Sequence, residues 1–257
     1  MTQRFAGQVA LVSGAAGGFG RLAAQQLARE GARLVLTDLR AGALASVVEQ
    51  LEAEGAEVAA LAGDVALEAT HNGLVDLARQ RFGQLDLALN NAGLAHGLGR
   101  LADISADEAA KVLAVDLFGV FLAMRAQLPL MVARGHGVIL NVASVAGLVG
   151  APMMSVYAAA KHGVIGLTKS AAGEYAAKGV RINAICPSFA ETPMVTEMLD
   201  HGKRPRAEAE ARLTGFVPLR RMAEPREVVD AMLWMLSPAN SFMTGHALAL
   251  DGGLSAI

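Results

Sequence analysis

Short apolar runs alternate along the chain with longer segments in which apolar positions recur with helical spacing. Each run is bounded by turn residues and has the length of a buried strand. Strands are therefore expected at 9–12, 33–37, 57–61, 85–89, 138–142, 180–185 and 247–250. Helical patterns lie between most of them; 21–30 and 43–54 are two examples, and 107–133 and 155–177 are the longest.

This alternation predicts an α/β fold of the Rossmann type. The expected core is one doubly wound parallel sheet of seven strands with helices on both faces, a three-layer αβα arrangement. We expect residues 1–257 to form a single dinucleotide-binding and catalytic domain. The composition agrees, because hydrophobic residues make up 53% of the chain and aromatic residues only 4%. Aliphatic side chains of this kind suit a parallel sheet that is covered on both faces.

One segment, 191–218, breaks this rhythm. It contains three prolines and several charges between helical fragments, and it follows the sixth expected strand. Ligands bind beyond the carboxyl ends of the strands in such folds. The segment is therefore expected to be a substrate lid, and the alternative is an ordinary surface excursion.

Charge and targeting features narrow the possible partners. The formal net charge of −2 favours neither nucleic acid nor an anionic membrane. The chain has no uninterrupted apolar run of about 20 residues, and its first residues lack the apolar core of a secretory signal, so a cytoplasmic protein is expected. The single cysteine, Cys186, is expected to be structural. The histidines show no metal-ligand spacing, so no metal is expected.

A glycine-rich loop directly follows the first expected strand and precedes a helix. Its sequence is Ser13-Gly14-Ala15-Ala16-Gly17-Gly18-Phe19-Gly20. Glycine lets the backbone turn tightly and approach a ligand closely, and the free N–H groups of the following helix attract an anion. A dinucleotide site requires a loop in this place, although Gly14, Gly18 and Gly20 are spaced differently from the common fingerprint.

Asp38 ends the second expected strand, where a dinucleotide site has an acid that binds the adenosine ribose. Its carboxylate can accept hydrogen bonds from both ribose hydroxyls and would repel a 2′-phosphate, which favours NAD over NADP. Arg40 argues in the opposite direction, because a nearby guanidinium can pair with the 2′-phosphate of NADP. In the alternative interpretation, Asp38 only caps the next helix.

Tyr157 and Lys161 stand four residues apart in an expected helix, so their side chains share one face. A cation beside a phenol favours the phenolate form, which suits the pair to general acid–base chemistry. Ser144 follows the fifth expected strand, where its hydroxyl can hydrogen-bond a substrate oxygen. Ser13 and Ser155 are rivals in less suitable places.

With these residues in order, the whole chain resembles the short-chain dehydrogenase/reductase family, in its shorter branch. The matching motifs are Ser13-Gly14-x-x-x-Gly18-Phe19-Gly20, Asp64-Val65, Asn90-Asn91-Ala92-Gly93, Ser144, Tyr157-x-x-x-Lys161, Pro187 to Thr192 and Asp251-Gly252-Gly253. Each motif alone is common, but all of them in this order are highly specific.

The resemblance implies a bound nicotinamide dinucleotide, and Asp38 favours NAD. Gly14, Gly18, Phe19 and Gly20 would border the pyrophosphate, and Asp38 would bind the adenine ribose. The other implied cofactor contacts are Asp64 and Val65 at the adenine, Asn91, Ala92 and Gly93 after the fourth strand, and Pro187, Ala190 and Thr192 beside the nicotinamide.

The resemblance also implies the catalytic roles. Tyr157 would pass a proton to or from the substrate oxygen, and Ser144 would orient and polarise that oxygen. Lys161 would bind the nicotinamide ribose and favour the phenolate of Tyr157. The hydride chemistry belongs to the cofactor.

Three positions depart from the family pattern. Ser13 replaces a threonine with little expected effect, and Ser188 replaces a glycine, which can alter how its loop approaches the nicotinamide. Asp116 replaces the asparagine that completes a catalytic tetrad. An ionised aspartate only accepts hydrogen bonds and can favour the ammonium form of Lys161. We expect Asp116 to keep the proton relay with a changed pH dependence; the alternative is a tolerated substitution without kinetic effect.

Two further features concern the substrate. His96 either faces the substrate or, in the favoured interpretation, is a solvated loop histidine. Apolar residues around the expected cleft form either an adaptable pocket or ordinary packing. They are Met153, Met154, Phe189, Met194, Met198 and Leu199.

The predicted function is the NAD-dependent interconversion of a secondary alcohol and a ketone, with a small apolar or cyclic molecule as substrate. One alternative is an NADPH-dependent 3-oxoacyl-carrier-protein reductase, against which Asp38 argues. Another is a non-catalytic dinucleotide-binding scaffold. The two longest helical patterns are apolar over much of their surface and favour the pairing of copies. Because relatives in the family are usually tetramers, a homotetramer is expected.

Overall fold

The structure, a computed structural model, describes residues 3–200 and 205–256, apart from the side chain of Met198. Within these residues seven strands form one parallel sheet in the order β3-β2-β1-β4-β5-β6-β7. They are β1 (Val9–Ser13), β2 (Arg33–Thr37), β3 (Val58–Ala60), β4 (Leu87–Asn90), β5 (Gly137–Val142), β6 (Val180–Pro187) and β7 (Ala247–Leu250). All seven expected strands are confirmed, with bounds that differ by two residues at most.

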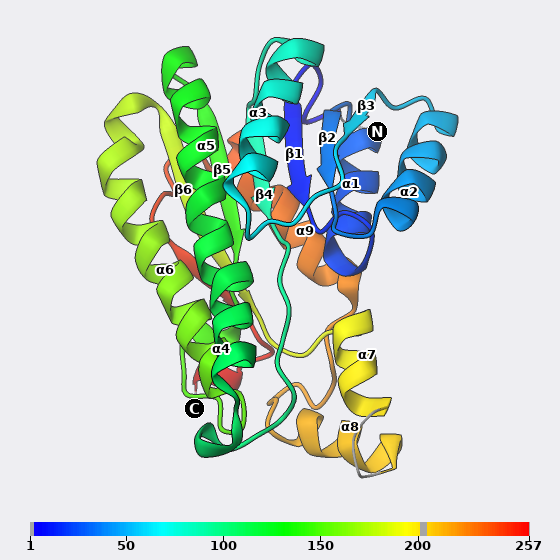
Figure 1. Cartoon of the computed structure of the whole chain (residues 1–257), viewed down its shortest axis with the longest axis vertical. Helices are drawn as coiled ribbons and strands as arrows, with labels where there is room; N and C mark the ends of the chain where they lie inside the picture. Colours follow the sequence, from blue (N-terminus) through cyan, green and yellow to red (C-terminus); the bar gives the residue numbers. More distant parts are fainter. Residues whose placement is uncertain (1–2, 201–204, 257) are drawn as a thin grey trace.

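Helices cover both faces of the sheet (Figure 1). One face carries α1 (Gly18–Arg29), α2 (Ala41–Ala53) and α9 (Pro225–Leu236), and the other carries α3 (Glu68–Phe82), α5 (Gly119–Arg134) and α6 (Ser155–Tyr175). The predicted Rossmann-type fold with three αβα layers is thereby confirmed.

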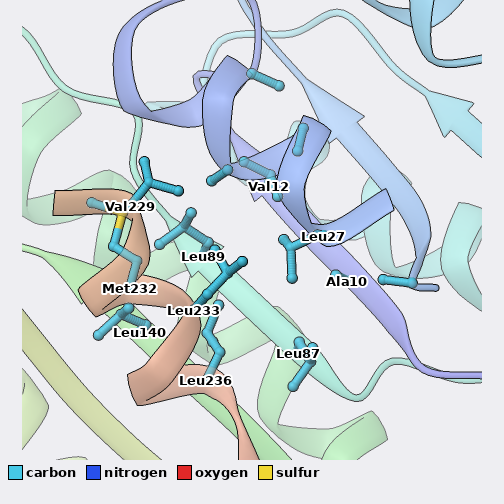
Figure 2. Close-up of a cluster of buried hydrophobic side chains, with 14 of the residues drawn as sticks. Ala10, Val12, Leu27, Leu87, Leu89, Leu140, Val229, Met232, Leu233 and Leu236 are labelled. Atoms are coloured by element: carbon cyan, nitrogen blue, oxygen red, sulfur yellow. The ribbon is translucent and has the colours of Figure 1, made fainter. Parts of the chain in front are cut away.

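Burial on both faces explains why the strands are continuous apolar runs in the sequence. Along β1, Ala10 and Val12 belong to the core beneath α1 and α9, whereas Val9 and Leu11 belong to the core beneath α3, α5 and α6. Figure 2 shows the first of these cores, in which side chains from the two helices lie over side chains from the strands. Labelled among them are Leu27, Val229, Met232 and Leu233 from the helices, and Val12, Leu87, Leu89 and Leu140 from the strands.

The helix expected at 107–133 is present as one helical run from 106 to 134, but it is not α-helical throughout. The segment divides into α4 (Ala106–Leu113), a π-helical turn (Ala114–Phe118) and α5. The π-helical turn contains Asp116, whose side chain is fully buried. Such turns are rare and occur frequently at functional sites. By contrast, the expected helix at 155–177 is confirmed as α6, which ends in a short 3-10 turn.

The segment between β6 and α9 lies beyond the body of the sheet, at the bottom of Figure 1. It contains α7 (Pro193–Asp200) and α8 (Arg206–Gly215). The helical fragments expected within 191–218 are therefore present, and residues 201–204 lie outside the described part of the chain. Among the described residues, no helix has the length and apolar character needed to cross a membrane.

Candidate active site

The strand order creates a crevice at the carboxyl ends of β1 and β4. The sheet continues from β1 to β2 on one side and to β4 on the other, and ligands bind at such a switch point. Ser13 ends β1, and its Oγ accepts hydrogen bonds from the N–H groups of Asn91 (3.0 Å) and Ala92 (3.1 Å). In return, Nδ2 of Asn91 donates to the carbonyl oxygen of Ser13 at 2.9 Å. These bonds hold the two strand ends together.

Each matching glycine of the loop after β1 has a structural reason to be glycine. Gly14 and Gly18 have φ angles of +65° and +49°, which L side chains rarely adopt. A Cβ on Gly20 would lie 2.1 Å from the carbonyl oxygen of Gly14. No side chain caps α1, whose N-cap residue is Gly17, so the N–H groups of its first turn are available to an anion. Phe19 packs its side chain against the core.

Asp38 is buried against this glycine loop. One carboxylate oxygen accepts the N–H of Ala16 at 3.0 Å, and the other accepts the N–H of Arg40 at 3.0 Å. The helix-capping interpretation of Asp38 is wrong, because no side chain caps α2 and Arg40 is its N-cap residue. Nε of Arg40 lies 3.3 Å from Asp38, and the Arg40 side chain is 66% exposed. A fixed carboxylate thus stands beside the loop, with an exposed guanidinium next to it.

Asp64 and Val65 follow β3, and the chain fixes both in place. Oδ1 of Asp64 accepts the N–H of Ala66 at 2.9 Å. Nε2 of His71 lies 2.7 Å from the carbonyl oxygen of Val65 and donates to it, because a carbonyl only accepts. Burial lowers the pKa of His71 and keeps its ring neutral. The sequence analysis missed this contact, for which the signal was a histidine among the buried positions of a helix.

Tyr157 and Lys161 lie one turn apart on α6, as expected. Nζ of Lys161 is 5.4 Å from the centre of the Tyr157 ring and donates to the carbonyl oxygen of Val142 at 3.1 Å. Ser144 follows the end of β5, and its Oγ lies 3.5 Å from the carbonyl oxygen of Pro187. The structure therefore brings the ends of β5 and β6 to the amino-terminal part of α6.

Asp116 reaches this group from the π-helical turn. Its Oδ2 lies 3.0 Å from Nζ of Lys161, and its Oδ1 accepts the N–H of Leu94 at 2.8 Å. Both charged residues are deeply buried, with 0% of Asp116 and 3% of Lys161 exposed. Burial opposes the charge on Lys161, but Asp116 and then Tyr157 favour it, and the net effect raises the pKa of Lys161. Lys161 is therefore held as an ammonium ion.

Gly93 shows how tightly the ion pair is enclosed. A Cβ at this position would lie 3.2 Å from Oδ2 of Asp116 and 3.4 Å from Nζ of Lys161. The first distance is closer than most Cβ contacts, so a larger residue would require the Asp116 carboxylate to shift. The loop after β4 thus approaches the Lys161 ammonium with backbone alone.

The residues expected beside the nicotinamide lie where β6 gives way to α7. Pro187 ends β6, and Ala190 is buried and pairs with Ala223 in an isolated bridge. The side chain of Thr192 lies 3.9 Å from the position that a Cβ of Gly18 would occupy. The start of the segment 191–218 therefore lies against the glycine loop.

The other serines fit less well than Ser144 as partners of a substrate oxygen. The hydroxyl of Ser13 is already the acceptor that joins β1 to β4. Ser155 begins α6, and its Oγ is buried. Ser188 has no positive φ, so its backbone does not need the glycine that the family has there.

The sequence analysis missed a buried amide network beneath the site. Nδ2 of Asn90 donates to Oδ1 of Asn141 at 2.9 Å, and Nε2 of Gln127 donates to Oδ1 of Asn90 at 2.8 Å. Nδ2 of Asn141 donates to Oγ1 of Thr168 at 2.9 Å. The network joins β4, β5, α5 and α6, and so positions the helix that carries Tyr157. Asparagines inside two apolar strands were the available signal.

Three further expectations can be compared with the structure. His96 is only 5% exposed, so its interpretation as a solvated loop residue is wrong. Cys186 is buried, and burial raises the pKa of its thiol to about 12, which agrees with a structural role. In the part of the chain that the structure describes, no group of three or more His, Cys, Asp and Glu side chains is arranged to hold a metal ion.

A dinucleotide-dependent oxidoreductase needs an anion-binding helix start and a group for acid–base chemistry near it. The start of α1 meets the first need, and Tyr157 with Lys161 meets the second. A family model described as Enoyl-(Acyl carrier protein) reductase matches residues 14–255. The chain belongs to the short-chain dehydrogenase/reductase family, whose members use nicotinamide dinucleotides.

The chain is similar over its whole length to enzymes of this family. It is 37% identical to a cyclohexanol dehydrogenase of Acinetobacter sp. (strain SE19), an alignment that covers 98% of this chain and 96% of the relative. It is 39% identical to a cis-4-hydroxycyclohexanecarboxylate dehydrogenase of Sinomonas cyclohexanicum over 100% of both chains. The crystal structure of levodione reductase superimposes with a TM-score of 0.94 at 37% identity, covering 98% of this chain and 99% of the other.

The two donors that face Asp116 lead to a stability prediction. An amide in place of the carboxylate can accept from Lys161 or from the N–H of Leu94, and its own NH2 then faces the other donor. We expect Asp116→Asn to lower the free energy of unfolding at pH 7 by about 3 kcal/mol, as when a buried ion pair loses one partner. Urea denaturation measures this loss.

The control is Asp76→Asn, which removes an exposed i, i+3 partner of Arg79 and is expected to change stability little. The effect of Asp116→Asn also has a defined pH dependence. The folded-state pKa of Lys161 is raised. The difference in the free energy of unfolding between wild type and variant is therefore fully present at pH values below the ordinary pKa of lysine, and it shrinks as the pH rises through the raised pKa. A difference that is absent at pH 7 would contradict the prediction.

Proposed function

We propose that the protein is an NAD-dependent oxidoreductase that interconverts small cyclic secondary alcohols and ketones. The observation that carries the proposal is the buried Lys161 ammonium, fixed by Asp116 and lying beside the ring of Tyr157. A fixed cation next to a phenol is what a tyrosine needs to act as general acid and base. The names of the cyclohexanol and hydroxycyclohexanecarboxylate dehydrogenases support the substrate class.

The chain's own residues account for the proton transfer. In alcohol oxidation, the phenolate of Tyr157 takes the hydroxyl proton while the hydroxyl of Ser144 holds the substrate oxygen. In ketone reduction, Tyr157 returns the proton to that oxygen. Lys161 stabilises the phenolate electrostatically, and Asp116 holds Lys161 in its charged form. When bound, the nicotinamide supplies the hydride chemistry.

The residues at the strand ends fit the dinucleotide. Its pyrophosphate would lie at the uncapped start of α1, where the glycines leave no Cβ in the way. The proposed contacts are Gly14, Gly18, Phe19 and Gly20 at the pyrophosphate, Asp38 at the ribose, Asp64 and Val65 at the adenine, Asn91, Ala92 and Gly93 along the cofactor, Tyr157 and Lys161 at the nicotinamide ribose, and Pro187, Ala190 and Thr192 at the nicotinamide.

The proposed lid consists of α7 and α8, which follow the end of β6. The closeness of Thr192 to Gly18 supports this role, because it brings the start of α7 near the cofactor crevice. Leu199 of α7 is buried, and Met194 is exposed on the same helix. Met154 and Phe189 are half-buried, and the side chain of Met198 lies outside the described residues. These side chains favour an apolar substrate.

The test of this mechanism compares the two tyrosines in the sequence, both of which lie on α6. We expect Tyr157→Phe to lower kcat for cyclohexanol oxidation by roughly a thousandfold, because it removes the general base. The variant should still bind NADH, as measured by fluorescence titration. Tyr175→Phe is the control and should keep full activity. Equal turnover by Tyr157→Phe would overturn the assigned chemistry.

A second test concerns the cofactor. We expect the wild type to use NAD with a higher kcat/KM than NADP, because the Asp38 carboxylate repels a 2′-phosphate. Asp38→Asn should reduce the NAD preference by about tenfold or more, since it removes a like-charge contact and leaves Arg40 free to pair with the phosphate. Asp76→Asn, at an exposed aspartate of α3, is the matched control. A wild type that prefers NADP would contradict the assignment of NAD and favour the carrier-protein reductase alternative.

The proposed assembly is a homotetramer, and exposed apolar side chains support it. Phe118 and Phe121 stack on each other at 5.6 Å between ring centres and remain partly exposed. Phe121 also lines a groove along α5 and α6, together with Pro129 and Leu167. Pairing of these helices between copies would bury this surface. Light scattering of the wild type should give four times the mass of one chain. Phe121→Glu should lower this measured mass. A wild-type monomer would contradict the proposal.

A further inference from the structure

His96 has an unusual environment for a loop histidine. It lies in the loop between β4 and α4, yet only 5% of it is exposed. Its Nδ1 is 2.7 Å from the carbonyl oxygen of Gly97. Its Nε2 is also buried and has no hydrogen-bond partner among the described residues. Buried polar groups of proteins are nearly always paired, so this nitrogen is a place where a bound molecule can supply the partner that the described residues do not.

The contact with Gly97 fixes the chemistry of the free nitrogen. A carbonyl oxygen only accepts hydrogen bonds, so Nδ1 of His96 carries the hydrogen. In the neutral imidazole, Nε2 is then a bare acceptor. The partner it lacks is a hydrogen-bond donor, such as a hydroxyl group. A ketone oxygen cannot serve this neutral ring, because it only accepts.

The loop that carries His96 is tied at both ends to the catalytic region. At one end, Gly93 lies against the Asp116–Lys161 ion pair, and Leu94 donates its N–H to Asp116 at 2.8 Å. At the other end, the N–H of Gly99 donates to the carbonyl oxygen of Met153 at 3.1 Å. Met153 precedes α6, the helix that carries Tyr157. His96 thus lies midway along the segment that links Lys161 to the entry of this helix.

We propose that His96 is a specificity-determining residue, whose Nε2 accepts a hydrogen bond from a second hydroxyl group of the substrate. The enzyme then prefers cyclic diols to cyclic alcohols with a single hydroxyl. This inference rests on the proposed function, since it names the substrate class for the same site. A site that pairs a substrate hydroxyl rejects analogues without it, because its own polar group is left unpaired.

The experiment measures kcat/KM with NAD for cyclohexanol, for the 1,2-, 1,3- and 1,4-cyclohexanediols and for 4-hydroxycyclohexanecarboxylate. In the wild type, we expect at least one diol to exceed cyclohexanol by about tenfold or more. His96→Leu should abolish this preference and keep cyclohexanol turnover within a fewfold. His96→Gln should restore part of it, because its carbonyl oxygen can take the place of Nε2. His136→Leu, at an exposed histidine, is the control.

Binding supplies a readout that does not depend on turnover. Calorimetry with the enzyme–NADH complex should show tighter binding of the preferred diol than of cyclohexanol, and His96→Leu should remove the difference. If no cyclic alcohol is oxidised but the diol binds through His96, the proposed function fails and the subsite stands. If the wild type oxidises cyclic alcohols without a diol preference, or His96→Leu keeps that preference, the inference is overturned.

Discussion

Burial of both faces of the parallel sheet is the constraint on which the site depends. With helices on either side, a polar side chain in the middle of a strand reaches no water, so polar residues gather where strands end. Ser13 and Asn91 stand at the carboxyl ends of β1 and β4, and Ser144 follows β5. The asparagines that do lie within β4 and β5 are paired with each other and with side chains of the covering helices.

The same burial determines the electrostatics beside Tyr157. An exposed pair of lysine and aspartate contributes little to stability, because water screens it. Lys161 and Asp116 have almost no exposed surface, so Lys161 depends on its partners in the protein to remain charged. One carboxylate oxygen forms the ion pair with Lys161, and the other accepts the N–H of Leu94. A permanent cation therefore belongs to the folded structure itself.

The strands, the glycine loop and the Tyr157–Lys161 pair could be predicted because local patterns encode them. Continuous apolar runs follow from burial on both faces, and a spacing of four residues specifies one helix face. The π-helical turn within the helix at 107–133 could not be predicted, because it coincides with the inward position of Asp116, which faces a lysine that is distant in sequence. The burial of His96 could not be predicted either, because the sequence of a loop has no periodic pattern that distinguishes buried from exposed positions.

The π-helical turn at Ala114–Phe118 also restricts how the length of this region can change in evolution. Each residue of an α-helix advances it by about 100°. A π-helical turn accommodates one residue more than an α-helical turn, so deletion of one residue would leave a regular α-helix and withdraw Asp116 from Lys161. Such a deletion would therefore preserve the helices and their phase but would lose the buried ion pair.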